Sequence, residues 1–379
     1  MSATVAPRAS AAERQRVVAD LVHLCEVESP SRRERAMADA VAAMLREAGI
    51  EAAEDRTRAE TGSDAGNLLA RIPGPPGART IMLCTHLDTV PLEAPVNVVE
   101  RDGVLTNEND AILGADNKAA VAVVLAIARR FAAEPPPVGI ELVFTTCEEP
   151  GLLGAKAFDV SSLSADLGFV FDHASPIGEL VVAAPSYYRV DASFRGQSAH
   201  AGIRPEDGRN AIASAARAVA ALELGRLDAE TTANVGTIEG GTARNVVAER
   251  CRVELEARSL DHDRASDVVR RMVDSLTESA SDCECDLELG VEEVSRAYRI
   301  PRSAPVVEVA AAALSGLGIE PRPIATGGGS DAHVFQARGL SCLNVANGTV
   351  ANHQPDERVS VEALETMLDV TLGIVAHSA

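Results

Sequence analysis

The chain has 379 residues, a length that suits two domains better than one hydrophobic core. Apolar residues make up 46% of it and charges of both signs are plentiful, which argues against a disordered protein. The formal net charge of −21 argues against nucleic acid or an anionic membrane as a partner, because both are polyanions.

The cysteines and the N-terminal segment bear on the cellular compartment. The seven cysteines are dispersed, and an odd, scattered set does not suggest a disulfide framework. The N-terminal segment lacks the apolar region of a signal peptide, and no run approaches the ~20 apolar residues of a membrane span. We therefore expect a cytoplasmic protein.

The first half of the sequence alternates helical and strand-like segments. Helical periodicity over residues 11–49 is interrupted by Ser29-Pro30-Ser31, which predicts two helices. A run rich in Ala and Val predicts a further helix over residues 116–131. Strands are expected at residues 67–72, 80–85, 139–146 and 167–171. This alternation indicates an α/β fold with a mixed, mostly parallel sheet and helices on both faces.

The pattern changes near Tyr187. Residues 188–194 alternate between apolar and polar side chains, as a half-exposed strand does. Helices are expected at residues 210–222 and 263–280, and strands at residues 232–238, 251–259 and 285–294. The order β-α-β-β-α-β is that of a ferredoxin-like α+β module. We therefore expect one domain made of residues 1–184 and 296–379, interrupted by a second domain at residues 185–295.

Titratable side chains gather at the ends of the predicted strands and in loops. The segments are CTHLDTV (84–90), GADNK (114–118), TTCEEPG (145–151), FVFDH (169–173) and NHQPD (352–356). The carboxyl ends of strands in an open α/β sheet meet at one crevice, the usual ligand site. The candidates for this crevice are His86, Asp88, Asp116, Glu148, Glu149, Asp172 and His353.

Taken singly, these residues have structural explanations. His86 could be a hydrogen-bonded core histidine, and Asp116 could simply cap a helix. Taken together, several carboxylates buried without counter-charge would each cost several kcal/mol. Lys118 and a few arginines do not obviously supply that charge, whereas a divalent metal does. The joint interpretation as a metal site is therefore preferred.

The ligand types indicate which metal the site suits, and the number of ligands indicates how many ions it holds. Two imidazoles with three carboxylates suit Zn²⁺, with Co²⁺ or Mn²⁺ as alternatives. Five ligands are too many for one tetrahedral site, but they fit two metals that share one carboxylate. One glutamate of the Glu148-Glu149 pair then remains as a general base.

Several motifs occur in an order that resembles the M20 metallopeptidases, the group that includes carboxypeptidase G, acylamino-acid deacylases and peptidase T. They are HLDTV, GADNKA, CEEPGLLGA, GQSAHAG, GGGSDA and the late Asn352-His353. Residues 230–247, ETTANVGTIEGGTARNVV, are most similar to peptidase T and peptidase T-like proteins. The resemblance extends over essentially the whole chain.

The resemblance implies an assignment of the metal ligands. His86 and Asp172 would hold one ion, Glu149 and His353 would hold the other, and Asp116 would bridge them. The implied cofactor is two Zn²⁺ per chain. The interrupted first domain would be the catalytic di-metal domain.

The resemblance also assigns the residues around the metals. Asp88 would hydrogen-bond the second ring nitrogen of His86 and fix its tautomer. Glu148 would be the general base, which takes a proton from a water between the metals and passes it to the leaving amine. In this family the peptide bond after the bridging Asp is commonly cis, so a cis Asp116–Asn117 bond is expected.

The inserted domain resembles the family's lid and dimerisation domain, which implies a homodimer. There His200 would act as an oxyanion donor, often from the partner subunit. Asn245 and Arg258 match substrate-contacting positions, and the Arg258 fork suits a carboxylate. Main-chain donors near Gly328 and Ser330 would bind a terminal carboxylate.

Short peptides are the implied substrates, and a tripeptide aminopeptidase is the implied activity. An M20-type deacylase of N-acyl amino acids uses the same chemistry and stays an alternative. A metal-binding protein without turnover is a third possibility. His173 and His333 depart from the pattern of close relatives, and the sequence assigns neither of them a role.

Overall fold

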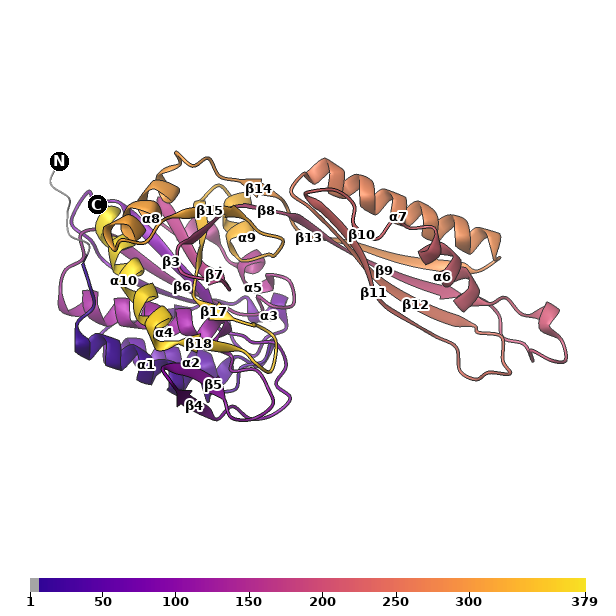
Figure 1. Ribbon diagram of the computed structural model, residues 1–379, viewed down its shortest axis with the longest axis horizontal. Coiled ribbons are helices and arrows are strands. Elements are labelled where there is room, and N and C mark those ends of the chain that lie inside the picture. Colours follow the sequence, from indigo (N-terminus) through magenta and orange to yellow (C-terminus); the bar gives the residue numbers. More distant parts are fainter. Residues whose placement is uncertain (1–6) are drawn as a thin grey trace. The chain divides into compact units, whose positions relative to one another are not determined.

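A computed structural model describes residues 7–379, and within them the chain divides into two units (Figure 1). The first unit contains the described residues up to Val182, together with Arg299–Ala325 and Ser330–Ala379. The second unit contains Ala183–Tyr298 and Thr326–Gly329. The chain therefore leaves the first unit after Val182 and re-enters it at Arg299, and it leaves once more, briefly, over Thr326–Gly329.

A mixed β-sheet lies at the centre of the first unit. Its strand order is β1-β2-β6-β3-β7-β16-β8-β14, and β15 pairs with β8. The strands are β1 (Ala52–Glu54), β2 (Leu68–Ile72), β3 (Thr80–His86), β6 (Gly139–Thr145), β7 (Leu167–His173), β8 (Glu179–Ala184), β14 (Tyr298–Arg299), β15 (Arg322–Ala325) and β16 (Ser341–Ala346). The central strands β6, β3, β7 and β16 are parallel, whereas the β1–β2, β2–β6 and β16–β8 pairs are antiparallel. The predicted mixed, mostly parallel sheet is confirmed.

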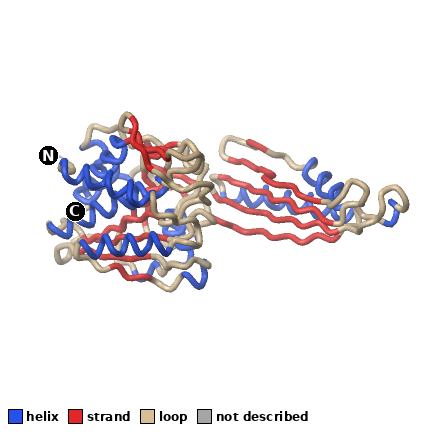
Figure 2. The backbone as a smooth tube through the Cα atoms, turned by 90° about the horizontal axis from the view of Figure 1, so that it is seen from below, coloured by secondary structure: helices blue, strands red, loops and turns tan. Residues whose placement is uncertain are grey.

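Helices flank this sheet (Figure 2). They are α1 (Ala11–Cys25), α2 (Arg35–Glu47), α3 (Arg58–Thr61), α4 (Ala115–Ala133), α5 (Leu153–Ala157), α8 (Pro305–Gly316), α9 (Ala332–Ala337) and α10 (Val361–His377). The apolar helix α4 packs against β3 and β7 and is covered by α1 and α10. Met82 and Cys84, which share one face of β3, pack with residues of α5 and α9. The central strands are therefore buried, as their continuous apolar runs require.

A small antiparallel sheet in the same unit was not expected from the sequence. Its order is β17-β18-β5-β4, with β4 (Val98–Arg101), β5 (Val104–Asn107), β17 (Thr349–Val350) and β18 (Arg358–Ser360). Strands of two to four residues are too short to show periodicity in a sequence. The sheet matters for function because the loop between β17 and β18 carries His353.

The second unit is an antiparallel sheet with helices on it (Figure 1). The strand order is β10-β11-β12-β9-β13, with β9 (Ser186–Arg195), β10 (Gly225–Arg226), β11 (Thr231–Gly240), β12 (Arg250–Ser259) and β13 (Asp286–Ser295). Helices α6 (Ala211–Ala220) and α7 (His262–Asp282) pack on it. Along β9, Val190, Ala192 and Phe194 are buried and the residues between them are more exposed, as predicted for a half-exposed strand.

Local sequence explains where four of the helices begin. Ser10 and Glu13 form a capping box at α1, and Ser360 caps α10 by accepting from the Ala363 N–H. In the second unit Asn210 and Asp261 cap α6 and α7 in the same way. Among the described residues, no helix has both the length and the apolar content needed to cross a bilayer.

Candidate metal centre

The predicted metal-binding side chains lie where the central strands end. His86 is the last residue of β3, Asp172 is the last but one of β7, and Glu148 and Glu149 follow β6 closely. These three strands are parallel neighbours, so their carboxyl ends meet at one edge of the sheet. Asp116 lies at the start of α4, after Gly114 in a left-handed conformation. The Asp116–Asn117 bond is cis, as predicted.

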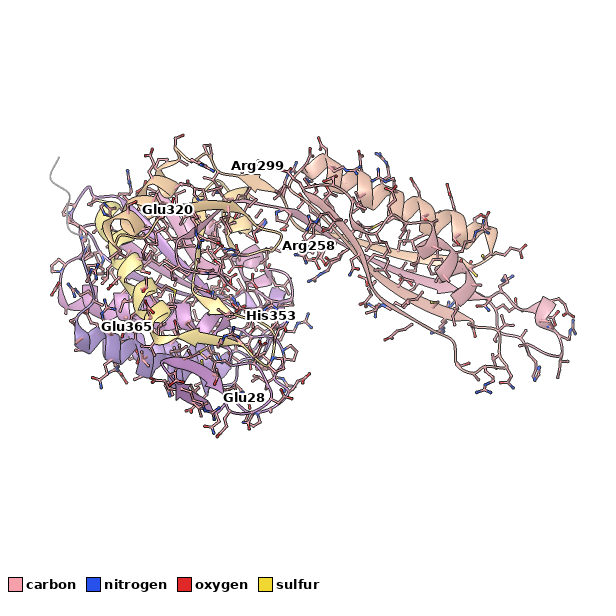
Figure 3. The ribbon with its side chains drawn as sticks, in the orientation of Figure 1. Glu28, Arg258, Arg299, Glu320, His353 and Glu365 are labelled. Atoms are coloured by element: carbon pink, nitrogen blue, oxygen red, sulfur yellow. The ribbon has the colours of Figure 1, made fainter. Side chains whose placement is uncertain are left out.

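Asp116 lies between the two histidines. Its Oδ1 is 3.4 Å from His86 Nε2, and its Oδ2 is 3.2 Å from His353 Nε2. The same nitrogen of each imidazole also lies near a second carboxylate: Asp172 Oδ1 is 3.6 Å from His86 Nε2, and Glu149 Oε1 is 3.0 Å from His353 Nε2. His353 reaches this point from the β17–β18 loop (Figure 3). The arrangement is two imidazole–carboxylate pairs that share the carboxylate of Asp116.

These donors fit divalent metal. Two ligand atoms that both lie about 2.0–2.1 Å from one tetrahedral Zn²⁺ are about 3.3 Å apart, which is the range of the separations around Asp116. Asp116 Oδ1 and Glu149 Oε1 are buried, and apart from these nearby imidazole nitrogens neither has a hydrogen-bond partner among the described residues. Buried carboxylate oxygens are rarely left without a partner, so a cation is the natural one.

Asp88 fixes the tautomer of His86. The Nδ1 of His86 is 2.9 Å from the main-chain carbonyl oxygen of Asp88, and a carbonyl can only accept a hydrogen bond. Nδ1 therefore carries the proton, and the lone pair on Nε2 points toward Asp116 and Asp172. The residue is the predicted one, but the closest contact is made by its main chain, since the carboxylate Oδ1 is 3.5 Å away.

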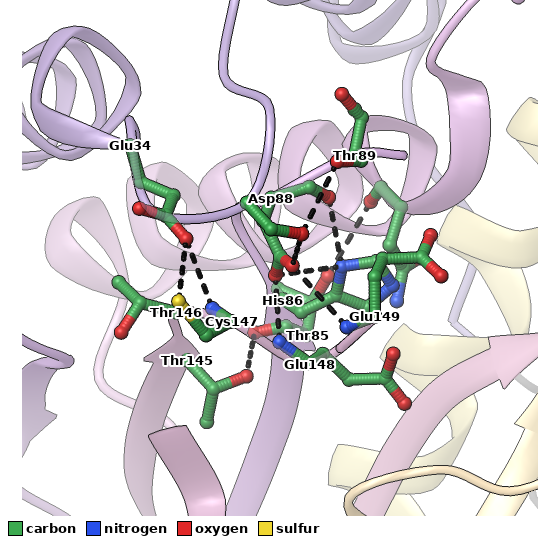
Figure 4. A network of polar contacts seen from close by, with 12 residues as sticks. Glu34, Thr85, His86, Asp88, Thr89, Thr145, Thr146, Cys147, Glu148 and Glu149 are labelled. Carbon is green, nitrogen blue, oxygen red and sulfur yellow. Dashed lines mark hydrogen bonds and ion pairs between the residues drawn. The ribbon is translucent and has the colours of Figure 1, made fainter. Parts of the chain in front are cut away.

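The carboxylate of Asp88 holds a different part of the site (Figure 4). It accepts the main-chain N–H of Glu148 at 2.9 Å, the main-chain N–H of Glu149 at 3.2 Å and the hydroxyl of Ser31 at 2.7 Å. Asp88 therefore orients His86 through its carbonyl and the glutamate pair through its side chain.

The electrostatics of the cluster follow from burial and close opposite charges. Burial opposes ionisation of Asp116, yet the neighbouring His353 and His86 hold its pKa below the usual range. The carboxylates of Asp116 and Glu149, which lie close to the ring of His353, raise its pKa to about 10. Burial raises the pKa of Asp172 to about 7 and that of Glu148 well above its usual value. The cluster therefore contains more carboxylates than the positive charge of its two histidines can neutralise.

Two residues that support the ligands were not singled out from the sequence. Asn344 accepts the main-chain N–H of Asp172 at 3.0 Å and donates to its carbonyl at 2.9 Å. Glu357 is buried, and its oxygens accept the N–H groups of Gly114 and Asp116, both at 2.8 Å. A polar residue inside the apolar strand β16 was a usable signal for Asn344. In the segment HQPDER, Glu357 looks like an ordinary solvated acid.

The remaining predicted residues, apart from Ser330, belong to the second unit. His200 is exposed, pairs through an isolated β-bridge with Val246, and accepts the Gly202 N–H on Nδ1 at 3.2 Å. The carbonyl of Asn245 accepts the Ala201 N–H at 3.0 Å, so Asn245 and His200 are on adjoining segments. Their position in one local cluster was not apparent from their separation in sequence.

Arg258, which Figure 3 labels, has several partners within the second unit. Its Nε and one terminal nitrogen each lie 3.2 Å from an oxygen of Glu256, and the other terminal nitrogen donates to the Gly327 carbonyl at 3.0 Å. The guanidinium carbon lies 4.0 Å from the ring centre of Tyr187. Of the five N–H groups of an arginine, these contacts use three. Arg258 can therefore bind a carboxylate through its remaining donors while Glu256 and Tyr187 hold its orientation.

Gly328, Ser330 and the two unassigned histidines have local partners. The Gly328 N–H donates to the Thr326 hydroxyl at 3.2 Å, in the second unit. The N–H of Ser330 lies 3.3 Å from Nδ1 of His333, which is buried in the first unit. His173 Nε2 is 3.4 Å from Glu179 Oε2. His173 and His333 thus have contacts that account for them structurally.

Family models match two segments of the chain. The model described as the peptidase dimerisation domain matches residues 186–282, within the second unit. The model described as peptidase family M28 matches residues 67–175, which contain His86, Asp116, Glu148, Glu149 and Asp172.

Comparisons over nearly the full length cover both units. The Bacillus subtilis protein YqjE, itself uncharacterised, is 33% identical over 96% of this chain and 99% of its own length. The crystal structure of an aminopeptidase PepT from Bacillus cereus is 34% identical, with a TM-score of 0.85 over 96% of this chain and 98% of that one. A tripeptidase from Staphylococcus aureus is 30% identical in sequence, and its crystal structure matches with a TM-score of 0.90 over 96% of this chain and 98% of that one.

Proposed function

Since the chain belongs to the M20 family of metallopeptidases, as a peptidase T-like exopeptidase, we propose that it removes the N-terminal residue from tripeptides and other short peptides with the help of two Zn²⁺ ions. The observation that carries the proposal is the carboxylate of Asp116, whose two oxygens face His86 and His353 separately. A single-metal site would not need a carboxylate placed between two imidazoles.

The ligands divide around Asp116. His86 and Asp172 would hold one ion, and His353 and Glu149 would hold the other. When bound, the ions supply Lewis-acid polarisation of the scissile carbonyl and ease the deprotonation of the attacking water. Zn²⁺ fits this imidazole and carboxylate set, and Co²⁺ or Mn²⁺ fit it as alternatives.

Glu148 is the base in this proposal. Its carboxyl oxygen lies within 4.8 Å of the ligand atoms of His86 and Asp172, and its main-chain N–H is fixed by Asp88. Burial raises its pKa well above the usual range, and the charge of Asp172 adds to that effect. A carboxylate with a raised pKa is a better proton acceptor, provided that nearby positive charge keeps it ionised. Glu148 would take the proton of the attacking water and deliver it to the leaving amine.

The second unit would act as the lid and dimerisation domain. The match of residues 186–282 to a peptidase dimerisation domain supports this assignment and a homodimer. Within it, His200 would donate a hydrogen bond to the oxyanion, and Asn245 and Arg258 would contact the substrate. His200 suits that role because it is exposed on a short turn rather than committed to the core.

Adjacent glutamates provide the test of the proposal. We expect Glu148→Gln to keep two metals per chain by elemental analysis and to lower kcat for a tripeptide by about 10²–10⁴-fold. Glu149→Gln, one residue along the same segment, should instead lose metal. A Glu148→Gln enzyme with a near wild-type rate would refute the base assignment.

A comparison of substrates tests the activity itself. Wild-type protein loaded with Zn²⁺, Co²⁺ or Mn²⁺ should cleave tripeptides faster than N-acyl amino acids. The reverse order would identify a deacylase, and the absence of any turnover would identify a binding protein.

A further inference from the structure

Glu34 is a buried acid beside the proposed base and has no role in the account above. It ends the segment between α1 and α2, and its side chain is fully buried. Its carboxylate is nevertheless saturated with donors. Oε1 accepts the main-chain N–H groups of Arg32 at 2.9 Å and Cys147 at 3.0 Å, and Oε2 accepts the Ser63 hydroxyl at 2.5 Å.

The contact with Cys147 is made at the residue directly before the proposed base. Cys147 immediately precedes Glu148, and its φ of 50° lies in the left-handed region that an L-residue rarely adopts without support. Glu34 Oε1 accepts from the Cys147 N–H and also lies 3.2 Å from its Sγ (Figure 4). The conformation that turns the chain into Glu148 is therefore held by Glu34.

Three successive N–H groups are fixed in this turn by two buried carboxylates. Cys147 donates to Glu34, while Glu148 and Glu149 donate to the two oxygens of Asp88. Glu34 and Asp88 come from segments that are distant in sequence from the turn and from each other. The main chain of the turn therefore has little freedom, and the direction of the Glu148 side chain depends on both anchors.

We propose that Glu34 is a positioning residue for catalysis, which sets the location of the Glu148 carboxylate through the main chain of Cys147. The inference rests on the proposed function, since it assumes that Glu148 is the base. A general base must lie within hydrogen-bonding distance of the proton that it removes, and a displacement of about 1 Å can lower a rate by about 10²-fold. Without Glu34, the buried Cys147 N–H would lose its acceptor and the turn would shift to find another.

Glu141 provides a matched control, because it is also a buried glutamate that accepts two main-chain N–H groups. Its Oε2 accepts from Ser164 at 2.9 Å and from Ala165 at 3.0 Å, and its side chain is 2% exposed. It lies on β6, and its contacts are with Arg71 of β2 and with the segment before β7 rather than with the Glu148 turn. Replacing it should disturb folding to a similar degree without moving the base.

The experiment uses the full-length, metal-loaded enzyme and a tripeptide. We expect Glu34→Ala to lower kcat by about 10²-fold with metal content and KM unchanged, and Glu141→Ala to lower the melting temperature without lowering kcat per folded enzyme. Glu34→Gln should restore most of the rate, since the amide oxygen can serve Cys147 and the amide nitrogen can donate to the Ser63 oxygen. Ser63→Ala, which leaves the Cys147 contact in place, should stay near the wild-type rate.

Hydrogen exchange gives a readout that does not depend on turnover. Glu34→Ala should speed exchange at Cys147–Glu149, and Glu141→Ala should not. If Glu34→Ala does not fold, Glu34→Asp, which keeps the charge but withdraws the oxygens by one methylene, replaces it in the same comparison. Equal loss of kcat in the Glu34 and Glu141 variants, or unchanged kcat and exchange in the Glu34 variant, would overturn the inference. A wild-type enzyme that cleaves no peptide would overturn the proposed function instead, and the exchange result would still decide whether Glu34 holds the turn.

Discussion

The carboxylate of Glu357 accepts the main-chain N–H of Asp116 at 2.8 Å. Its other oxygen accepts the N–H of Gly114 at the same distance. Glu357 lies four residues after His353, at the end of the loop that carries this histidine. One buried side chain therefore ties the segment of the proposed bridging ligand to the segment of a proposed terminal ligand.

Metal affinity should depend on this connection. Glutamine at position 357 has one acceptor oxygen, so either Gly114 or Asp116 would face an N–H₂ group instead of an oxygen. We expect Glu357→Gln to weaken binding of the more weakly held Zn²⁺ by about 10–100-fold, the usual effect of losing a residue that orients a ligand. Competition with a chromophoric chelator measures this. Glu141→Gln is the control, and equal affinities in the two variants would show that the contact does not support the metals.

Metal binding should weaken as the pH falls. Protons and metal ions compete for the same donors, because a ligand must be deprotonated to bind. Contacts with Asp116 and Glu149 raise the pKa of His353 to about 10, and burial raises that of Asp172 to about 7. Between pH 8 and pH 6 the metal must therefore displace the proton of His353 throughout, and that of Asp172 increasingly below pH 7.

Each proton that the metal displaces raises the apparent Kd for Zn²⁺ about tenfold per unit fall in pH, so binding weakens as the pH falls. We expect Zn²⁺ binding at pH 6 to be at least about 100-fold weaker than at pH 8, measured by chelator competition in buffers that do not bind zinc. His353→Ala should bind more weakly overall and with a smaller slope. An affinity that is flat across this range would contradict the ligand assignment.

His200 should affect turnover but not metal content. If it donates to the oxyanion, its removal costs about 10²–10³-fold in kcat, the typical effect of losing one such donor. His200→Ala should keep the wild-type complement of zinc by elemental analysis. His262→Ala is the matched control in the same unit, because His262 contacts the Ser186 hydroxyl at the start of α7. A His200→Ala enzyme as fast as the His262→Ala enzyme would exclude the oxyanion role.

The regular parts of the fold were predictable because their signals are local. The apolar run over residues 116–131 became α4, and the alternation over residues 188–194 became β9. The sheet formed by β4, β5, β17 and β18 was missed, because its strands are short and its two local pairs are joined only through β5 and β18, which are more than two hundred residues apart. Nothing within a segment of two to four residues indicates such a distant partner.

The candidate site likewise has contacts that the sequence can reveal and contacts that it cannot. The meeting of His86, Glu149 and Asp172 follows from the rule that parallel strands share one carboxyl edge, which a sequence can reveal. The contact of the Asp88 carbonyl with His86, and the anchoring roles of Glu34 and Glu357, depend on loop conformations. Glu34 follows two arginines in the sequence, a context in which an acid is expected to face water.

The point at which the chain leaves and re-enters the first unit has a consequence for protein engineering. The Ile300 N–H donates to the Val182 carbonyl at 2.7 Å, so the two crossing points are adjacent. A short turn can therefore join them, and the entropy of closing such a turn is small. The same junction is a natural site for exchanging one inserted module for another, because a graft there has to satisfy the neighbouring strands β8 and β14 and, beyond them, only the short segment Thr326–Gly329.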